Sequence, residues 1–102
     1  MARTQSYTIK FVTVKADAPT AMASVGSQFT SIRDCVQSHI TAGNITTDSL
    51  ALAADMKTLT VTRTFSEEAY SDLVAIKTPA AIESDIAALP DVSTVTYSFT
   101  VA

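Results

Sequence analysis

The stretch from Leu59 to Tyr70 constrains the fold of this chain more than any other part of the sequence. Across residues 59–65, apolar and polar residues alternate with period two, which predicts a β-strand with one buried face. Ser66 and the two glutamates after it are typical of a helix N-cap, because acidic side chains are favoured at the positive end of the helix dipole. A strand that leads directly into a helix must pack that helix against its own sheet, so this junction predicts an α+β architecture.

Periodicity predicts the other elements in the same way. The expected strands are residues 6–14, 48–54, 59–65 and 92–101, and the expected helices are residues 21–41, 67–77 and 79–89, with a tight turn at residues 55–58. Thr78 and Pro79 divide the second helical region into two pieces, since proline is tolerated in a first helical turn. The order is therefore strand, helix, strand, strand, helix, strand.

This order predicts a ferredoxin-like βαββαβ fold for residues 1–102, as a single α+β domain. Two βαβ halves can close one four-stranded antiparallel sheet with the helices on one face. Right-handed crossovers then place the first and third strands in the centre of the sheet.

Charge and cysteine content exclude several classes of function. The net charge is −3 and the seven basic residues are scattered, so we expect no nucleic-acid partner. The longest apolar segment, residues 50–54, is far too short to span a membrane, and no apolar signal-peptide core follows Met1. Cys35 is the only cysteine, which excludes a disulfide within the chain and fits a reducing compartment. A cytoplasmic location is therefore expected.

The sheet face away from the helices is predicted to carry almost no charge. Alternation assigns to it Thr8, Lys10, Val12, Val14, Ser49, Ala51, Ala53, Thr60, Thr62, Thr64, Thr94, Thr96, Ser98 and Thr100. A solvated face usually carries many charged residues, whereas Lys10 is the single formal charge here. Two interpretations remain open: a threonine-rich face of a monomer, or an interface with a second copy or another protein, for which a homodimer is the first choice.

The chain resembles the dimeric α+β-barrel families, which include the antibiotic-biosynthesis-monooxygenase-like proteins and related small stress-responsive domains. The likeness lies in the element order, the size, and the Leu59–Tyr70 segment, which is similar to the strand-to-helix passage of those families. The resemblance implies a ferredoxin-like fold that pairs through its open sheet face. Such enzymes place polar or aromatic side chains, often His or Trp, in a pocket between sheet and helices, and this chain has one His and no Trp. The resemblance therefore implies little about activity.

Arg63 is the strongest candidate for a ligand-binding residue. Alternation places it on the helix-covered face with Val61 and Phe65, where an arginine must find an acid or an anion, or extend to the sheet edge. It is either an anchor for a carboxylate or phosphate ligand, or a structural residue that forms an ion pair or extends its charged group to the sheet edge. Tyr70 and Tyr97 could join it in a pocket, although aromatic residues at such spacing also form cores.

His39 and Cys35 are the remaining candidates for chemistry. His39 lies near the end of the first predicted helix. Its role could be that of a general base, of a haem ligand, or of a structural residue that the negative end of the helix dipole favours. Cys35 and His39 are four residues apart, but two ligands are too few for a structural zinc site. A buried, unreactive thiol is the simpler interpretation of Cys35. We expect no metal and no cofactor, and the sequence carries no phosphate-binding loop or nucleophile elbow.

Two functions follow from these observations. The first is a non-enzymatic, self-associating interaction or structural protein, such as a small accessory or virus-encoded factor, because the open face is uncharged and no catalytic set is visible. The alternative is a cofactor-independent enzyme or small-ligand-binding domain of the dimeric α+β-barrel kind, with a pocket near Arg63 that includes Tyr70, Tyr97 or His39. The sequence leaves the question of enzymatic activity open and favours the non-enzymatic function.

Overall fold

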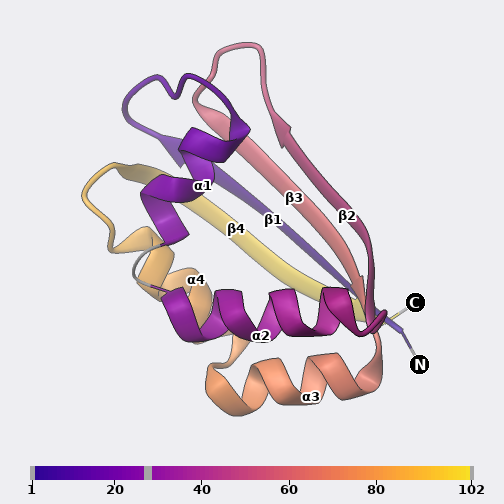
Figure 1. The fold of residues 1–102 in the computed structure, drawn as a ribbon. Helices are drawn as coiled ribbons and strands as arrows, with labels where there is room; N and C mark the ends of the chain where they lie inside the picture. The colour runs from indigo at the N-terminus through magenta and orange to yellow at the C-terminus, as the bar shows by residue number, and fades with distance from the viewer. Residues whose placement is uncertain (1, 27–28, 102) are drawn as a thin grey trace.

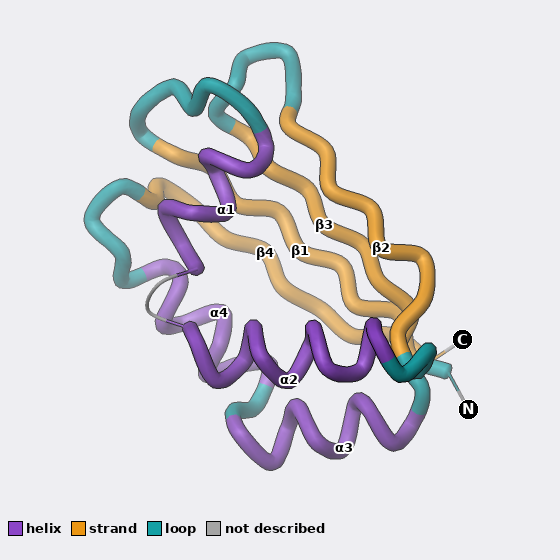
Figure 2. The backbone as a smooth tube through the Cα atoms, viewed as in Figure 1, coloured by secondary structure: helices purple, strands orange, loops and turns teal. Residues whose placement is uncertain are grey.

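A four-stranded antiparallel sheet carries all the described helices on one face (Figure 1). The structure is a computed structural model that describes residues 2–26 and 29–101. The strands are β1 (Arg3–Phe11), β2 (Ile45–Leu52), β3 (Thr58–Phe65) and β4 (Val92–Val101), and the helices are α1 (Ala18–Gly26), α2 (Thr30–Thr41), α3 (Glu67–Ile76) and α4 (Pro79–Ala87). The strand order is β2-β3-β1-β4, which confirms the ferredoxin-like fold and the central positions of the first and third strands. Figure 2 shows the two layers, with the helices over one side of the sheet.

The junction between β3 and α3 forms as the sequence predicts. The Ser66 side chain accepts a hydrogen bond of 3.1 Å from the Ala69 backbone N–H, which satisfies one of the free donors of the first helical turn. Thr78 caps α4 in the same way, with Pro79 at its first position. Both caps fix where the chain leaves one element and enters the next.

The core lies between the sheet and the helices. Its largest fully buried side chains come from the two central strands and from α3: Phe65, Ile9, Leu59, Leu73 and Val61. The register pairs Ile9 with Leu59 across β1 and β3, so the apolar residues of neighbouring strands meet on one face. Burial of this face against the helices supplies the main driving force for the fold.

Several predicted boundaries were wrong because strand pairing moves them. β1 begins at Arg3 and ends at Phe11, three residues before the predicted end, and its ladder with β3 stops at Lys10. Val12 and Val14 therefore follow the strand as exposed loop residues and do not belong to the sheet face. β2 begins at Ile45 and ends at Leu52, with a register shift between Thr46 and Ser49, and the predicted strand residue Ala53 lies in the turn.

The predicted helix at residues 21–41 is two helices in the described chain. α1 and α2 run in different directions (Figure 1). The apolar stripe that predicted one helix, formed by Met22, Val25, Phe29, Ile32 and Val36, therefore does not follow a single straight axis. The predicted continuation through residues 27–28 lies outside the described residues. α2 ends at Thr41, the predicted last residue of this helical region, and Gly43 follows with a φ of +82°, the left-handed conformation that glycine adopts without strain.

The sheet face opposite the helices consists almost entirely of hydroxyl side chains. Across β3, β1 and β4 the register forms the rows Thr64-Thr4-Thr100, Thr62-Ser6-Ser98, Thr60-Thr8-Thr96 and Thr58-Lys10-Thr94. These rows contain nine residues that were predicted for this face, and Val12 lies outside it. The nine are Thr8, Lys10, Thr60, Thr62, Thr64, Thr94, Thr96, Ser98 and Thr100. No described helix combines the length and the apolar character that crossing a membrane requires.

Candidate ligand-binding cavity

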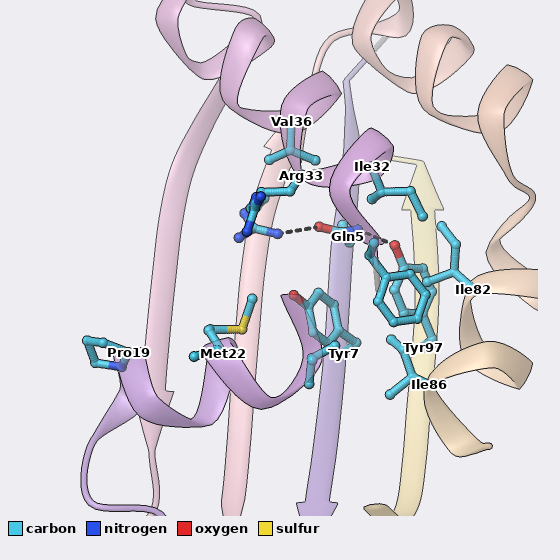
Figure 3. A pocket seen from close by; sticks show the side chains of 14 residues that line it. Gln5, Tyr7, Pro19, Met22, Ile32, Arg33, Val36, Ile82, Ile86 and Tyr97 are labelled. Atoms are coloured by element: carbon cyan, nitrogen blue, oxygen red, sulfur yellow. Dashed lines mark hydrogen bonds between the residues drawn. The ribbon is translucent and has the colours of Figure 1, made fainter. Parts of the chain in front are cut away.

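A cavity of about 430 Å³ lies between the sheet and three of the helices (Figure 3). Its walls are mainly apolar and come from α1, α2 and α4. The apolar wall residues are Pro19, Met22, Ala23, Val25, Phe29, Ile32, Val36, Ile82 and Ile86. Much of the apolar stripe that predicts a helix at residues 21–41 therefore faces a cavity.

The floor of the cavity is polar and comes from three strands. Gln5 on β1 is only 2% exposed and lies between Arg63 on β3 and Tyr97 on β4. Arg63 Nη1 donates to Gln5 Oε1 over 3.3 Å, and Gln5 Nε2 donates to Tyr97 Oη (Figure 3). These bonds satisfy the buried amide, which would otherwise destabilise the core.

Tyr97 lies against Tyr7 on the same floor. The two rings stack with centroids 5.1 Å apart and planes 15° from parallel, because the β1–β4 register pairs these residues directly. Burial raises the pKa of the Tyr97 phenol far above its usual value, and the hydrogen bond from Gln5 and the charge of Arg63 offset this only in part. The phenol therefore keeps its proton throughout the neutral pH range.

Basic and neutral groups supply the polarity of this site. Arg33, an exposed residue of α2, lines the cavity in addition to Arg63. Among the described lining residues there is no aspartate, glutamate or histidine. The cavity is therefore suited to an apolar molecule that carries oxygen acceptors.

Gln5 and Arg33 line the cavity but were not predicted to do so. The first strand was predicted to begin at Ser6, so Gln5 fell outside the alternation, although its parity matches that of Tyr7 and Ile9 on the buried face. The available signal was a polar side chain, that of Gln5, at a position whose parity predicts burial. Arg33 gave no such signal, because an arginine on a helix is usually a solvated surface residue.

The structure brings together two of the four residues predicted to bind a ligand. Arg63 and Tyr97 both line the cavity, and Arg63 is half-buried there. Tyr70 does not line it: the guanidinium of Arg3 lies 4.2 Å from its ring centroid, and Phe99 packs edge-on against it. His39 also lies elsewhere, at the contact between α2 and α3.

At that contact His39 joins the two helices. Its Nε2 lies 2.8 Å from Asp72 Oδ2 on α3, and its Nδ1 lies 3.0 Å from Asn44 Nδ2. The pKa of Cys35 is raised, first by burial and then by the negative charge of Asp72, which disfavours a nucleophilic thiolate. The described residues contain no group of three or more His, Cys, Asp or Glu that could hold a metal ion.

Comparison with known proteins finds a likeness of fold. No protein-family model matches the sequence, and no curated protein matches it significantly. A solved structure that matches is the crystal structure of a monooxygenase from the gene ActVA-Orf6 of Streptomyces coelicolor in complex with the ligand Nanaomycin D. The TM-score is 0.57 at 13% identity, and the match covers 99% of this chain and 87% of that chain. The expected resemblance to antibiotic-biosynthesis-monooxygenase-like proteins is confirmed at the level of the fold.

This match corrects the function that the sequence favoured. A non-enzymatic, self-associating interaction protein was the first interpretation, and it is wrong: the matching structure is that of a monooxygenase with a bound ligand. The finding favours the alternative, an enzyme or small-ligand-binding domain.

Proposed function

We propose that this protein binds a small, largely apolar molecule with oxygen substituents in the cavity between its sheet and helices. The observation that carries the proposal is the cavity itself, with apolar walls from three helices and a hydrogen-bonded polar floor of Arg63, Gln5 and Tyr97. Ligand sites are typically apolar clefts of about 300–1,000 Å³ with a few convergent polar groups, and this cavity has both properties.

The floor and the walls suggest a planar aromatic molecule. The flat faces of the stacked Tyr7 and Tyr97 rings and the aliphatic side chains of α4 can cover an aromatic body. Arg63 adds a positive charge beside the floor, which favours oxygen atoms with partial or full negative charge. An apolar molecule without oxygen would form no hydrogen bond with the Tyr97 hydroxyl.

Thermal unfolding with aromatic probes tests this proposal. We expect 1-tetralone, 9-fluorenone or anthrone to raise the melting temperature of the wild-type protein. At a ligand concentration about 100-fold above Kd, the free energy of unfolding should rise by about 2.7 kcal/mol. Isothermal titration calorimetry with the best probe then measures Kd. A melting temperature that no member of the set changes would remove the support for this function.

Monooxygenase activity is a second candidate, favoured by the activity named for the matching structure. A cofactor-independent monooxygenase must take its electrons from the substrate: a CH2 group and O2 give C=O and H2O. One oxygen atom enters the product and the other leaves as water, so atoms and electrons balance. Arg63 and Tyr97 would stabilise negative charge on a substrate oxygen when the CH2 group loses a proton to a water molecule.

Oxygen uptake with anthrone distinguishes an enzyme from a binding protein. Its CH2 group lies between two aromatic rings and ionises readily. An enzyme should consume one O2 per anthrone and place one ¹⁸O atom in the product when ¹⁸O2 is supplied. Uptake no faster than in buffer, together with measurable binding, would leave a small-ligand-binding domain.

A homodimer formed through the hydroxyl face is the proposed assembly. Among the paired residues of β1, β3 and β4 on that face, Lys10 is the one charged side chain, and surfaces that lack charge are typical of the centres of interfaces. Thr8 lies near the middle of the face, between Thr60 and Thr96. In a symmetric dimer, each substitution there occurs twice.

A Thr8→Lys variant tests this assembly. It should raise the dimer dissociation constant at least about tenfold, because two desolvated ammonium groups would meet in one interface. Light scattering coupled to size-exclusion chromatography measures the mass. Thr41→Lys, an exposed change at the end of α2, is the matched control and should leave the mass unchanged. A monomeric wild type at micromolar concentration would contradict the dimer.

A single-domain organisation of residues 1–102 and a cytoplasmic location of the protein stay predictions.

A further inference from the structure

The hydrogen-bonded row on the cavity floor has a fixed direction (Figure 3). An arginine side chain can only donate hydrogen bonds. Because Arg63 Nη1 donates to Gln5 over 3.3 Å, the amide oxygen of Gln5 must face Arg63, and its NH2 group must face Tyr97. The orientation of the Gln5 amide thus follows from its neighbours.

The direction of this row determines what Tyr97 can do. Its oxygen accepts from Gln5 Nε2, so its own O–H hydrogen must point to another acceptor. Within the described part of the chain, the bond from Gln5 is the only hydrogen bond of the Tyr97 hydroxyl. Tyr97 lines the cavity, and a molecule there can supply the missing acceptor.

We propose that Tyr97 is a specificity-determining hydrogen-bond donor, oriented by Gln5 and Arg63, and that the ligand of this cavity carries a carbonyl oxygen that accepts its hydrogen. This inference rests on the proposed ligand-binding function and names the class of ligand: apolar molecules with a carbonyl group, such as aryl ketones. A carbonyl group has two lone pairs and no hydrogen, so it matches a site that presents a donor.

One property of the site keeps the hydroxyl hydrogen in place, and another strengthens its hydrogen bond. Burial keeps the phenol protonated, because desolvation raises the pKa of Tyr97. Hydrogen bonds in a row polarise one another, and this row begins at a guanidinium charge. Gln5 and Arg63 act through Tyr97 and are positioning residues.

A matched pair of probes tests the inference. Tetralin is 1-tetralone without its carbonyl oxygen, and a site built to donate a hydrogen bond discriminates against the analogue that lacks the acceptor. We expect the wild-type protein to bind 1-tetralone about tenfold more tightly than tetralin. In infrared spectra, the carbonyl stretch of bound 1-tetralone should lie at a lower frequency than in an apolar solvent.

Two variants separate the donor from the packing. Tyr97→Phe keeps the stacked ring and should abolish both the ketone preference and the infrared shift. Tyr70→Phe removes a hydroxyl outside the cavity and should change neither. Gln5→Glu keeps the Tyr97 hydroxyl, but a carboxylate only accepts, so it should bind both Arg63 and the Tyr97 O–H. The hydroxyl hydrogen then turns away from the ligand, and the ketone preference should fall although the phenol is present.

The outcomes are distinguishable. Equal affinity of the wild type for the two probes would overturn the carbonyl inference and leave the ligand-binding function standing. A ketone preference and an infrared shift that survive in Tyr97→Phe would also overturn it. Failure of both probes to bind the wild type would remove the proposed function and the inference together.

Discussion

Replacement of Phe65 by alanine is expected to lower the free energy of unfolding by about 3–5 kcal/mol. Phe65 is the last residue of β3 and is fully buried, and its ring packs edge-on against Phe99 with centroids 5.3 Å apart. The loss combines the transfer free energy of the ring with the cost of the cavity left behind. Small domains are stable by about 5–15 kcal/mol, so the change removes a large fraction of the total. Urea unfolding followed by circular dichroism measures it.

The position of Phe65 explains why the effect should be large. The Ser66 backbone N–H, one residue later, donates to Asn44 O over 2.8 Å, and the Ser66 side chain caps α3. Phe65 thus lies where β3, the start of α3 and the loop between α2 and β2 meet, and its burial stabilises that junction. Val101→Ala, at a site on β4 that is 55% exposed, is the control and should change stability by less than about 0.5 kcal/mol. Similar losses in the two variants would contradict this view of the junction.

The sequence predicted those parts of the fold that depend on interactions between residues close together in the chain. Alternation over residues 59–65 and the Ser66 cap depend on neighbouring residues only, and both are present in the structure. The hydroxyl face followed from the same parity. Strand ends depend instead on the partner strand: β1 stops its ladder with β3 at Lys10, opposite Thr58, and no residue near Val12 signals that end.

The candidate site was harder to predict because it depends on space between elements. Parity placed Arg63 and Tyr97 on the covered face, but alternation cannot show whether helices fill the volume above them. The row from Arg63 through Gln5 to Tyr97 joins residues from three strands at sequence separations of 58 and 92 positions. The uncharged outer face was visible in the sequence and the inner cavity was not, which explains why the sequence favoured a surface function.

Filling the cavity should abolish ligand binding without unfolding the protein. Met22 projects from α1 toward the floor of the cavity (Figure 3). A Met22→Trp substitution places a much larger side chain in that space, and a bound molecule normally depends on having most of its surface buried. We expect the affinity for the best aromatic probe to fall by at least about 30-fold, as measured by calorimetry. Stability should stay the same or rise, because a filled cavity regains lost packing contacts.

The matched control is Met56→Trp at the exposed turn between β2 and β3. Met56 is not among the residues that line the cavity, so the same increase in size there should leave binding of the probe as in the wild type. Equal loss of affinity in both variants would indicate that bulky substitutions disturb the fold in general. Undiminished binding in a folded Met22→Trp variant would show that the ligand occupies another part of the molecule, because a tryptophan at this position and an aromatic ligand would compete for the same volume above Gln5 and Tyr97.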